Sequence, residues 1–231
     1  VLEGRTVEQS SLRRRKDGSL VDAEIFGVPV MLDDEQIGVL AMYNDITERV
    51  KTEQHLKHLA THDPLTMLPN RSLFYEHLDQ ALHRARRNKS RLAVFFLDLD
   101  GFKSVNDLLG HAQGDLLLQE VASRFNEALR SSDIVARLGG DEFAFVCENL
   151  STPGDAAIIA EKLLVSLSRK IQMAGQEMAI SGSIGISLFP EDGDEARDLL
   201  RYADAAMYRV KDQGKQHFQF FSWNGRPKEM G

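Results

Sequence analysis

Hydrophobic and polar residues alternate with a period of two along the first part of the chain, residues 1–47. Turn-forming residues interrupt this alternation near positions 16–18 and 32–35. The pattern predicts three strands, over residues 6–14, 20–32 and 36–44. Because three strands without a covering helix do not enclose a complete hydrophobic core, we expect this segment to be part of a larger folded unit.

The next segment has the spacing of a helix. Residues 48–61 contain neither proline nor glycine, and a thin apolar stripe at helical spacing is formed by Val50, Leu56, Leu59 and Ala60. The helix is either a simple spacer or a signalling helix that pairs with its copy across a dimer. The stripe is too short to separate these two interpretations.

After Asp63-Pro64 the pattern changes, and helical stretches alternate with short apolar runs. Helices are predicted over residues 72–87, 114–129, 154–169 and 196–213. Strands are predicted over residues 92–97, 134–137, 142–147, 178–189 and 217–221. The second and third of these strands flank Gly139-Gly140 as a hairpin. We therefore expect an α+β domain with one sheet and helices on its outer face.

Composition narrows the class of protein. The 231 residues are 42% hydrophobic and 27% charged, which is typical of a globular protein. The sequence lacks a long apolar run, so no membrane contact is expected in this fragment. The net charge of -7 argues against a nucleic-acid polymer as partner, which would require a basic surface. Since the sequence starts at Val1, we expect a fragment of a longer protein, whose other parts can include a membrane anchor.

The cysteine content indicates the redox state of the compartment. Cys147 is the single cysteine, so an internal disulfide is excluded and a reducing compartment is expected. It lies in an apolar run, where a buried structural thiol is expected rather than a nucleophile.

The apolar strand at 92–97 ends in two acids, Asp98 and Asp100, which alternation places on the same face. A carboxylate at the end of a buried strand is costly unless it is paired or binds a cation. The alternative is that one of these acids caps the following helix. Taken alone, this segment does not distinguish the two.

The hairpin supplies the second group of acids. Gly139 and Gly140 form a tip without side chains, and Asp141 and Glu142 follow directly, so an anion can approach the backbone beside a cation site. An ordinary glycine hairpin does not require consecutive acids. Together with Asp98, this pair offers the hard oxygen ligands that Mg²⁺ prefers in nucleotidyl transfer.

A series of motifs, in the order in which they occur, resembles the GGDEF family of diguanylate cyclases over about residues 63–221. They are Asp63-Pro64-Leu65-Thr66-Met67-Leu68-Pro69-Asn70-Arg71, Phe96-Leu97-Asp98-Leu99-Asp100-Gly101-Phe102-Lys103, Asn106-Asp107, Gly110-His111, Gly114-Asp115, Arg137-Leu138-Gly139-Gly140-Asp141-Glu142-Phe143, Ser183-Ile184-Gly185-Ile186-Ser187 and Ala203-Asp204-Ala205-Ala206-Met207-Tyr208. The resemblance implies an adenylyl-cyclase-like palm with a central five-stranded antiparallel sheet flanked by helices.

The first segment resembles the C-terminal half of a PAS sensor domain, chiefly in its closing Asp45-Ile46-Thr47-Glu48-Arg49. The other half, with the helices of the usual ligand pocket, has no counterpart in this sequence. The expected organisation is a partial PAS-like segment at 1–47, a linker helix at 48–62, a GGDEF domain at 63–223 and a tail at 224–231.

The resemblance also implies an activity, the joining of two GTP molecules into cyclic di-GMP in a bacterial cytoplasm. The enzyme would be a homodimer, because each domain holds half of the active site. The cofactor would be Mg²⁺ or Mn²⁺, bound by the side chains of Asp98 and Glu142 with help from the Leu99 carbonyl. Asp141 would either bind the metal or help to deprotonate the attacking hydroxyl.

Further positions match the substrate contacts of the family. Gly139 and Gly140 would let the triphosphate approach, and Lys103, Lys211 and Lys215 would contact it. Solvated surface lysines are the ordinary alternative. Lys211 and Lys215 would lie one helical turn apart if the last helix extends that far. This chain departs from the family at Lys215, where an arginine is usual, so the bidentate grip of a guanidinium is lost.

Asn106 and Asp115 match the positions that read the guanine edge. A carboxylate can accept from guanine N1-H and N2-H, and an amide can satisfy other atoms of the edge. The alternatives are a turn or capping role for Asn106 and a helix-dipole role for Asp115. A related subgroup that accepts adenine departs from Asp at this position, so Asp115 favours GTP.

Arg130 and Asp133 match the Arg-x-x-Asp of the inhibitory site of the family, which would bind the product cyclic di-GMP. Arginine can pair with a phosphate or with the guanine Hoogsteen edge, and the acid can accept from the base. A surface ion pair is the alternative. The second arginine that usually completes this site is not assigned.

Two other functions are weighed against the enzyme. A non-catalytic module that binds GTP or cyclic di-GMP could regulate an adjoining domain, although degenerate hairpins are the usual sign of that role and this hairpin is intact. A structural PAS dimerisation unit would explain the first segment but not the acids.

Overall fold

The computed structural model describes residues 7–33 and 35–221. By its internal contacts the chain divides into two compact units, Val1–Ala60 and Thr61–Gly231. The expected tail at 224–231 and the first six residues lie outside the described part. Within the described residues, no helix is both long and apolar enough to cross a membrane.

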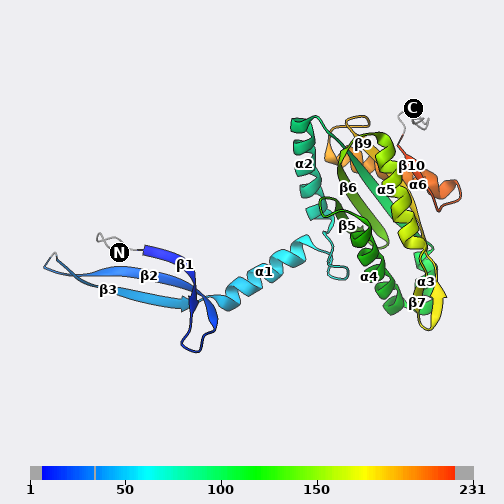
Figure 1. Ribbon diagram of the computed structural model, residues 1–231. Helices are drawn as coiled ribbons and strands as arrows, with labels where there is room; N and C mark the ends of the chain where they lie inside the picture. Colours follow the sequence, from blue (N-terminus) through cyan, green and yellow to red (C-terminus); the bar gives the residue numbers. More distant parts are fainter. Residues whose placement is uncertain (1–6, 34, 222–231) are drawn as a thin grey trace. The chain divides into compact units, whose positions relative to one another are not determined.

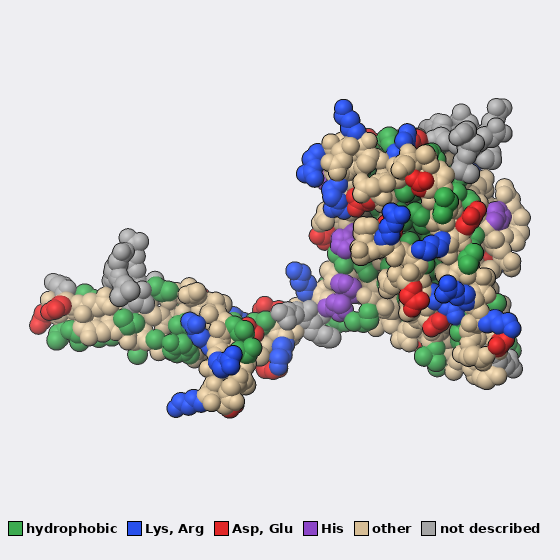
Figure 2. Space-filling view, viewed as in Figure 1, with side chains coloured by type: hydrophobic (Ala, Val, Ile, Leu, Met, Phe, Trp, Pro, Cys, Tyr) green, Lys and Arg blue, Asp and Glu red, His purple; other side chains and the backbone are tan. Residues whose placement is uncertain are grey.

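The first unit contains a three-stranded antiparallel sheet in the order β1-β2-β3. Its strands are β1 (Val7–Arg14), β2 (Leu20–Leu32) and β3 (Glu35–Asp45), as the alternation predicts, and α1 (Thr47–Thr61) follows. Large hydrophobic side chains of this sheet are exposed, for example Leu40, Met42 and Tyr43 at 62%, 64% and 65%. Figure 2 shows hydrophobic side chains along this surface. The PAS interpretation stays a prediction.

The second unit is built on a five-stranded sheet in the order β10-β9-β4-β6-β5. The strands are β4 (Arg91–Asp100), β5 (Ile134–Gly139), β6 (Glu142–Leu150), β9 (Ser181–Phe189) and β10 (Phe218–Phe220). The α+β class and the five strands are confirmed. The expectation of a wholly antiparallel sheet is wrong, because β10 runs parallel to β9. A parallel pair requires a crossover connection, and the last long helix provides it.

Helices cover both faces of this sheet, which corrects the expectation of one covered face (Figure 1). On one face, α4 (His111–Ala128) and α5 (Pro153–Ser168) pack against alternate residues of β4 and β6, with the rings of Phe95, Phe125, Phe143 and Phe145 at the centre. On the other face, α2 (Arg71–Asn88) and α6 (Ala196–Asp212) pack against the intervening residues. Every residue of β4 from Leu92 to Leu99 is consequently buried.

Two short elements differ from the expected pattern. The helix expected from residue 114 begins earlier, at His111, and a separate α3 (Phe102–Leu109) precedes it. Gly110 divides the two helices, because its φ of 82° lies in the left-handed region. The strand expected over 178–189 is β9 alone, and a hairpin of β7 (Ile171–Met173) and β8 (Gln176–Met178) precedes it.

The packing of α6 on β9 depends on one glycine. A Cβ atom at Gly185 would lie 1.9 Å from the Ala203 carbonyl oxygen and 2.2 Å from the Met207 amide nitrogen. The helix backbone therefore rests directly on the strand. This close approach carries the end of α6, including Lys211, toward the end of β4.

Candidate active site

Asp98 and Glu142 face each other across neighbouring strands. They are register partners of β4 and β6, at the end of β4 and at the start of β6. Asp98 is only 8% exposed. Burial raises the pKa of Asp98, and the charges of Asp141 and Asp100 raise it further, against the opposing effect of Lys211. Burial also raises the pKa of Glu142, with added repulsion from Asp204, Asp98 and Asp141.

Two cations partly balance these acids. The Lys211 Nζ atom, on α6, lies 2.7 Å from Asp98 Oδ2. The Arg71 guanidinium, at the start of α2, lies 3.5 Å from Glu142 Oε2. Burial raises the pKa of Asp204 on α6 too, and Arg71 and Lys211 oppose that shift. The arrangement is a cluster of acids, incompletely neutralised, at one end of the sheet.

The acids at this end of the sheet are chemically suited to a divalent cation. Like-charged carboxylates on adjacent strands destabilise each other, and carboxylate oxygens are the ligands that Mg²⁺ prefers. Within the described residues, no three acidic, histidine or cysteine side chains enclose a metal position, and Lys211 supplies the positive charge next to Asp98. Asp98 and Glu142 are thus close to each other, while a complete ligand set is not assembled.

The alternative capping role for the acids at the end of β4 is wrong. The residue that precedes α3 is Gly101, and no side chain caps the helix there. Asp100 instead accepts hydrogen bonds from the hydroxyls of Ser181 and Ser183, at 3.0 and 2.8 Å. The backbone amide of Gln216 also donates to it, at 3.3 Å. Asp100 therefore fastens β9 and the segment after α6 to the end of β4.

The backbone at the hairpin tip has positive φ angles, which glycine adopts readily. Gly139 and Gly140 have φ values of 144° and 53°, and a Cβ at either position would meet no atom within 4 Å. The approach to the tip is thus open. The Leu99 amide donates to the Asp141 carbonyl oxygen at 3.2 Å, which ties the tip to the end of β4.

Arg137 fixes the base of this tip. Its guanidinium donates to the Gly140 carbonyl oxygen from Nε and Nη2, at 2.9 and 2.8 Å. It also pairs with Asp63, whose oxygens lie 2.8 and 3.0 Å from Nη1. Asp63 in turn accepts from the Thr66 amide and hydroxyl at 2.9 and 2.7 Å. The segments 63–71 and 137–143 are both recognisable as motifs in the sequence, but the contact between them is visible only in the fold.

The expected guanine-reading residues lie on α3 and α4. Asn106 is partly exposed on α3, and its Oδ1 atom is buried without a hydrogen-bond partner in the described part of the chain. The alternative role, in which this side-chain oxygen caps a helix or stabilises a turn, is therefore not observed. Asp115 is exposed in the second turn of α4, next to Gly114.

The three expected phosphate contacts have different settings. Lys103 is exposed on α3, and Lys211 pairs with Asp98. The helix α6 ends at Asp212, so Lys215 does not lie one helical turn beyond Lys211 on the same helix. It lies in a turn after Gly214, with a φ of 66°. The segment that carries Lys215 is held beside Asp100 by Gln216.

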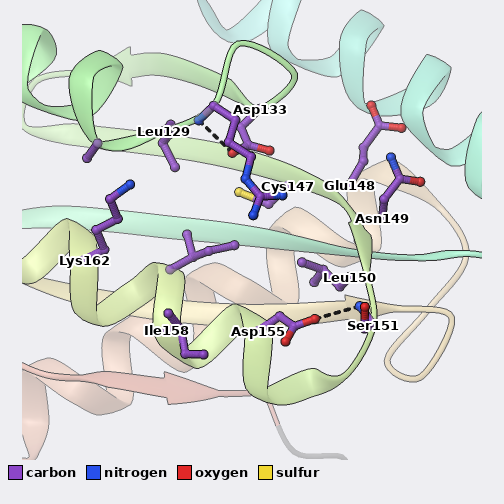
Figure 3. A pocket seen from close by; sticks show the side chains of 13 residues that line it. Leu129, Asp133, Cys147, Glu148, Asn149, Leu150, Ser151, Asp155, Ile158 and Lys162 are labelled. Atoms are coloured by element: carbon purple, nitrogen blue, oxygen red, sulfur yellow. Dashed lines mark hydrogen bonds between the residues drawn. The ribbon is translucent and has the colours of Figure 1, made fainter.

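Arg130 and Asp133 line a cavity of about 440 Å³ between β6 and α5. Asp133 accepts from the Arg130 backbone amide at 3.1 Å, so this carboxylate also shapes the turn before β5. Lys162 of α5 lines the same cavity, and Figure 3 shows it projecting from that helix. Sequence reasoning missed Lys162, because a lysine on a helix carries no local signal.

Cys147 lines the cavity as well and is 1% exposed. Burial raises the pKa of its thiol well above the ordinary value. The predicted burial of this thiol is confirmed, and a structural role stays a prediction.

Comparisons with known proteins agree with this geometry. Residues 60–217 match the family model described as the diguanylate cyclase, GGDEF domain. The chain is 49% identical over 186 residues to the bifunctional diguanylate cyclase/cyclic di-GMP phosphodiesterase MucR of Pseudomonas aeruginosa. That alignment covers 80% of this chain and 27% of MucR, so the chain spans about a quarter of the relative.

Solved structures give the same result. The GGDEF domain of TpbB from Pseudomonas aeruginosa is 44% identical with a TM-score of 0.69, covering 71% of this chain and 95% of that one. The GGDEF domain of DgcB from Caulobacter crescentus, in complex with c-di-GMP, is 31% identical with a TM-score of 0.65. That match covers 70% of this chain and 95% of the DgcB chain.

Proposed function

This chain belongs to the GGDEF diguanylate cyclase family, and we propose that it condenses two GTP molecules into cyclic di-GMP with release of two pyrophosphates. One observation carries the proposal: Asp98 and Glu142 are cross-strand partners beside an intact, open Gly139-Gly140 tip. Two carboxylates that face each other at this point are the ligands that a divalent cation requires for nucleotidyl transfer.

The residues of the site would have two roles, metal binding and triphosphate binding. Asp98 and Glu142 would hold Mg²⁺ or Mn²⁺, with the Leu99 carbonyl as a further ligand. When bound, the cation would lower the pKa of the attacking hydroxyl and neutralise charge on the phosphate. Lys103, Lys211 and Lys215 would contact the triphosphate. Release of Lys211 from Asp98 would make its ammonium available to a phosphate oxygen.

Two domains would face each other, each with one GTP. The 3'-oxygen of each GTP forms a bond to the α-phosphorus of the other, and the bond from that phosphorus to the pyrophosphate oxygen breaks. Asp141, at the hairpin tip directly before Glu142, would either bind the metal or accept the hydroxyl proton. Asn106 and Asp115 would hold the guanine so that the two sugars and phosphates align.

The test is turnover of GTP with Mg²⁺ by the purified chain, with cyclic di-GMP identified as the product. Glu142→Ala removes one acid of the cross-strand pair and should lower turnover on the order of a thousandfold. Glu127→Ala is the matched control, because Glu127 is an exposed acid on α4. Equal turnover by the Glu142 variant and its control would reject the assignment.

The cavity beside α5 supports a further part of the proposal, inhibition by the product. Arg130 and Asp133 would contact a guanine or phosphate of cyclic di-GMP, as the family resemblance implies, and Lys162 would supply a second cation to the phosphates. Lys162→Ala should raise the product concentration needed for half-inhibition about tenfold, with unchanged initial rates. Lys170→Ala, an exposed lysine beyond the cavity, is the control. Unaltered inhibition in the Lys162 variant would remove it from this site.

The alternative is a module that binds GTP or cyclic di-GMP without turnover and regulates an adjoining domain. The name of MucR includes both activities, so a neighbouring phosphodiesterase is compatible with this family. Binding of GTP with no product, in the same assay, would favour this alternative.

A further inference from the structure

Gly114, in the first turns of α4, lies against the side chain of Asn106 on α3. A Cβ atom built at Gly114 would lie 1.9 Å from Asn106 Oδ1 and 3.0 Å from Asn106 Cγ. It would also lie 3.3 Å from Cζ of Phe102. Real side chains do not approach this closely, so the observed position of the amide requires a glycine at 114.

This contact determines how the Asn106 amide is presented. Its Oδ1 is turned inward and buried, without a hydrogen-bond partner in the described part of the chain. The residue as a whole is still partly exposed. The amide nitrogen, a donor, is therefore the polar atom left for a ligand, and guanine offers acceptors at N3, N7 and O6.

We propose that Gly114 is a positioning residue that sets the preference for guanine by holding the Asn106 amide beside Asp115. This inference rests on the proposed function and adds a residue that does not itself touch the nucleotide. Asp115 follows Gly114 directly, so one turn of α4 would carry an acceptor for the guanine donors and would orient the amide that donates to the guanine acceptors.

The consequence of a methyl group at this position is local. The atoms that it would meet most closely belong to the end of the Asn106 side chain, which can rotate, and not to a backbone. Gly114→Ala should therefore displace the amide and leave α3 and α4 packed. Alanine also favours a helix over glycine, which further protects the fold.

The experiment measures binding of 3'-deoxy-GTP, which lacks the attacking hydroxyl and cannot turn over, to the whole chain by calorimetry with Mg²⁺. Gly114→Ala should weaken this binding about tenfold, the effect of one lost hydrogen bond. Binding of 3'-deoxy-ATP, which the proposed guanine preference makes weak in the parent chain, should change little. Gly154→Ala is the matched control, because its Cβ would meet only Thr152 Oγ1 at 3.4 Å in the first turn of α5.

A double variant separates positioning from a general loss of structure. In the Asn106→Ala background the clash is gone, so adding Gly114→Ala should cost no further affinity. Thermal unfolding should place all variants near the parent. Equal binding by Gly114→Ala and the parent, or an undiminished further loss in the Asn106→Ala background, overturns the inference while GTP binding itself stands. Failure of the parent to bind 3'-deoxy-GTP rejects the proposed function and this inference with it.

Discussion

The ion pair between Asp63 and Arg137 connects the segment after α1 to the hairpin of β5 and β6. The two side chains are 17% and 11% exposed, and Arg137 also binds the Gly140 carbonyl. The Thr61 carbonyl, at the end of α1, accepts from the Asn70 amide at 2.9 Å. The last residue of α1 is therefore hydrogen-bonded to the residue that precedes α2.

This pair predicts a dependence of stability on pH. Burial raises the pKa of Asp63, but hydrogen bonds from Thr66 and Arg137 outweigh it, and the pKa lies below the ordinary value. A carboxyl whose pKa is lowered on folding contributes stability above its unfolded pKa, about 3.9, and loses it as the pH falls through the folded pKa.

Asp63→Asn should thus unfold more easily than the parent at neutral pH, by about 2 kcal/mol. The difference should shrink as the pH falls below about 4, because the carboxyl of the unfolded parent is protonated first and that of the folded parent only at the lower, folded pKa. Urea unfolding at both pH values measures this difference, and Asp79→Asn, an exposed acid on α2, is the control. A difference that stays constant down to acid pH would contradict the assigned role of the pair.

Some site residues could be predicted from the sequence and others could not. Asp98, Asp141 and Glu142 were predicted because acids that border apolar strands are unusual and the motifs occur in order. Arg71 was not, because its partner Glu142 is 71 positions away and a lone arginine gives no sign of a partner. Gly114 belongs to one of the sequence motifs, but the need for a glycine there comes from the adjacent Asn106 side chain, which only the fold reveals.

Among the elements, α6 and β9 are in direct backbone contact at Gly185, with no room for a side chain between them. Gly185→Ala would place a methyl group against the backbone of α6, at Ala203 and Met207, which cannot rotate away. We expect a loss of at least about 3 kcal/mol in the free energy of unfolding. Chemical denaturation of Gly185→Ala measures it against Gly193→Ala, whose Cβ would meet its nearest atom at an ordinary 3.4 Å. Similar stability of the two variants would contradict this packing.

The long elements were predictable and the short ones were not. Helices such as α2 and α4, each 18 residues long, repeat their apolar spacing several times. The eight residues of α3 and the three-residue strands β7 and β8 contain too few repeats. The direction of β10 depends on the path of α6 over the sheet, so strand periodicity alone did not reveal its parallel pairing.

At the scale of the whole molecule, the proposed chemistry needs two chains. Each domain offers one set of acids and one candidate guanine site, whereas the product contains two nucleotides. The exposed apolar residues of the first unit are compatible with a sheet that another surface covers, and a signalling helix at α1 stays a prediction. The rate per chain should consequently depend on the fraction of chains whose GGDEF domains are dimeric.

The most direct measurement is the rate of cyclic di-GMP formation from saturating GTP and Mg²⁺ as the purified chain is diluted. We expect the rate per chain to fall in proportion to concentration once dimers dissociate, and two pyrophosphates to appear for each cyclic product. A rate per chain that stays constant while the chain is monomeric would contradict the account, as would the absence of cyclic product at every concentration.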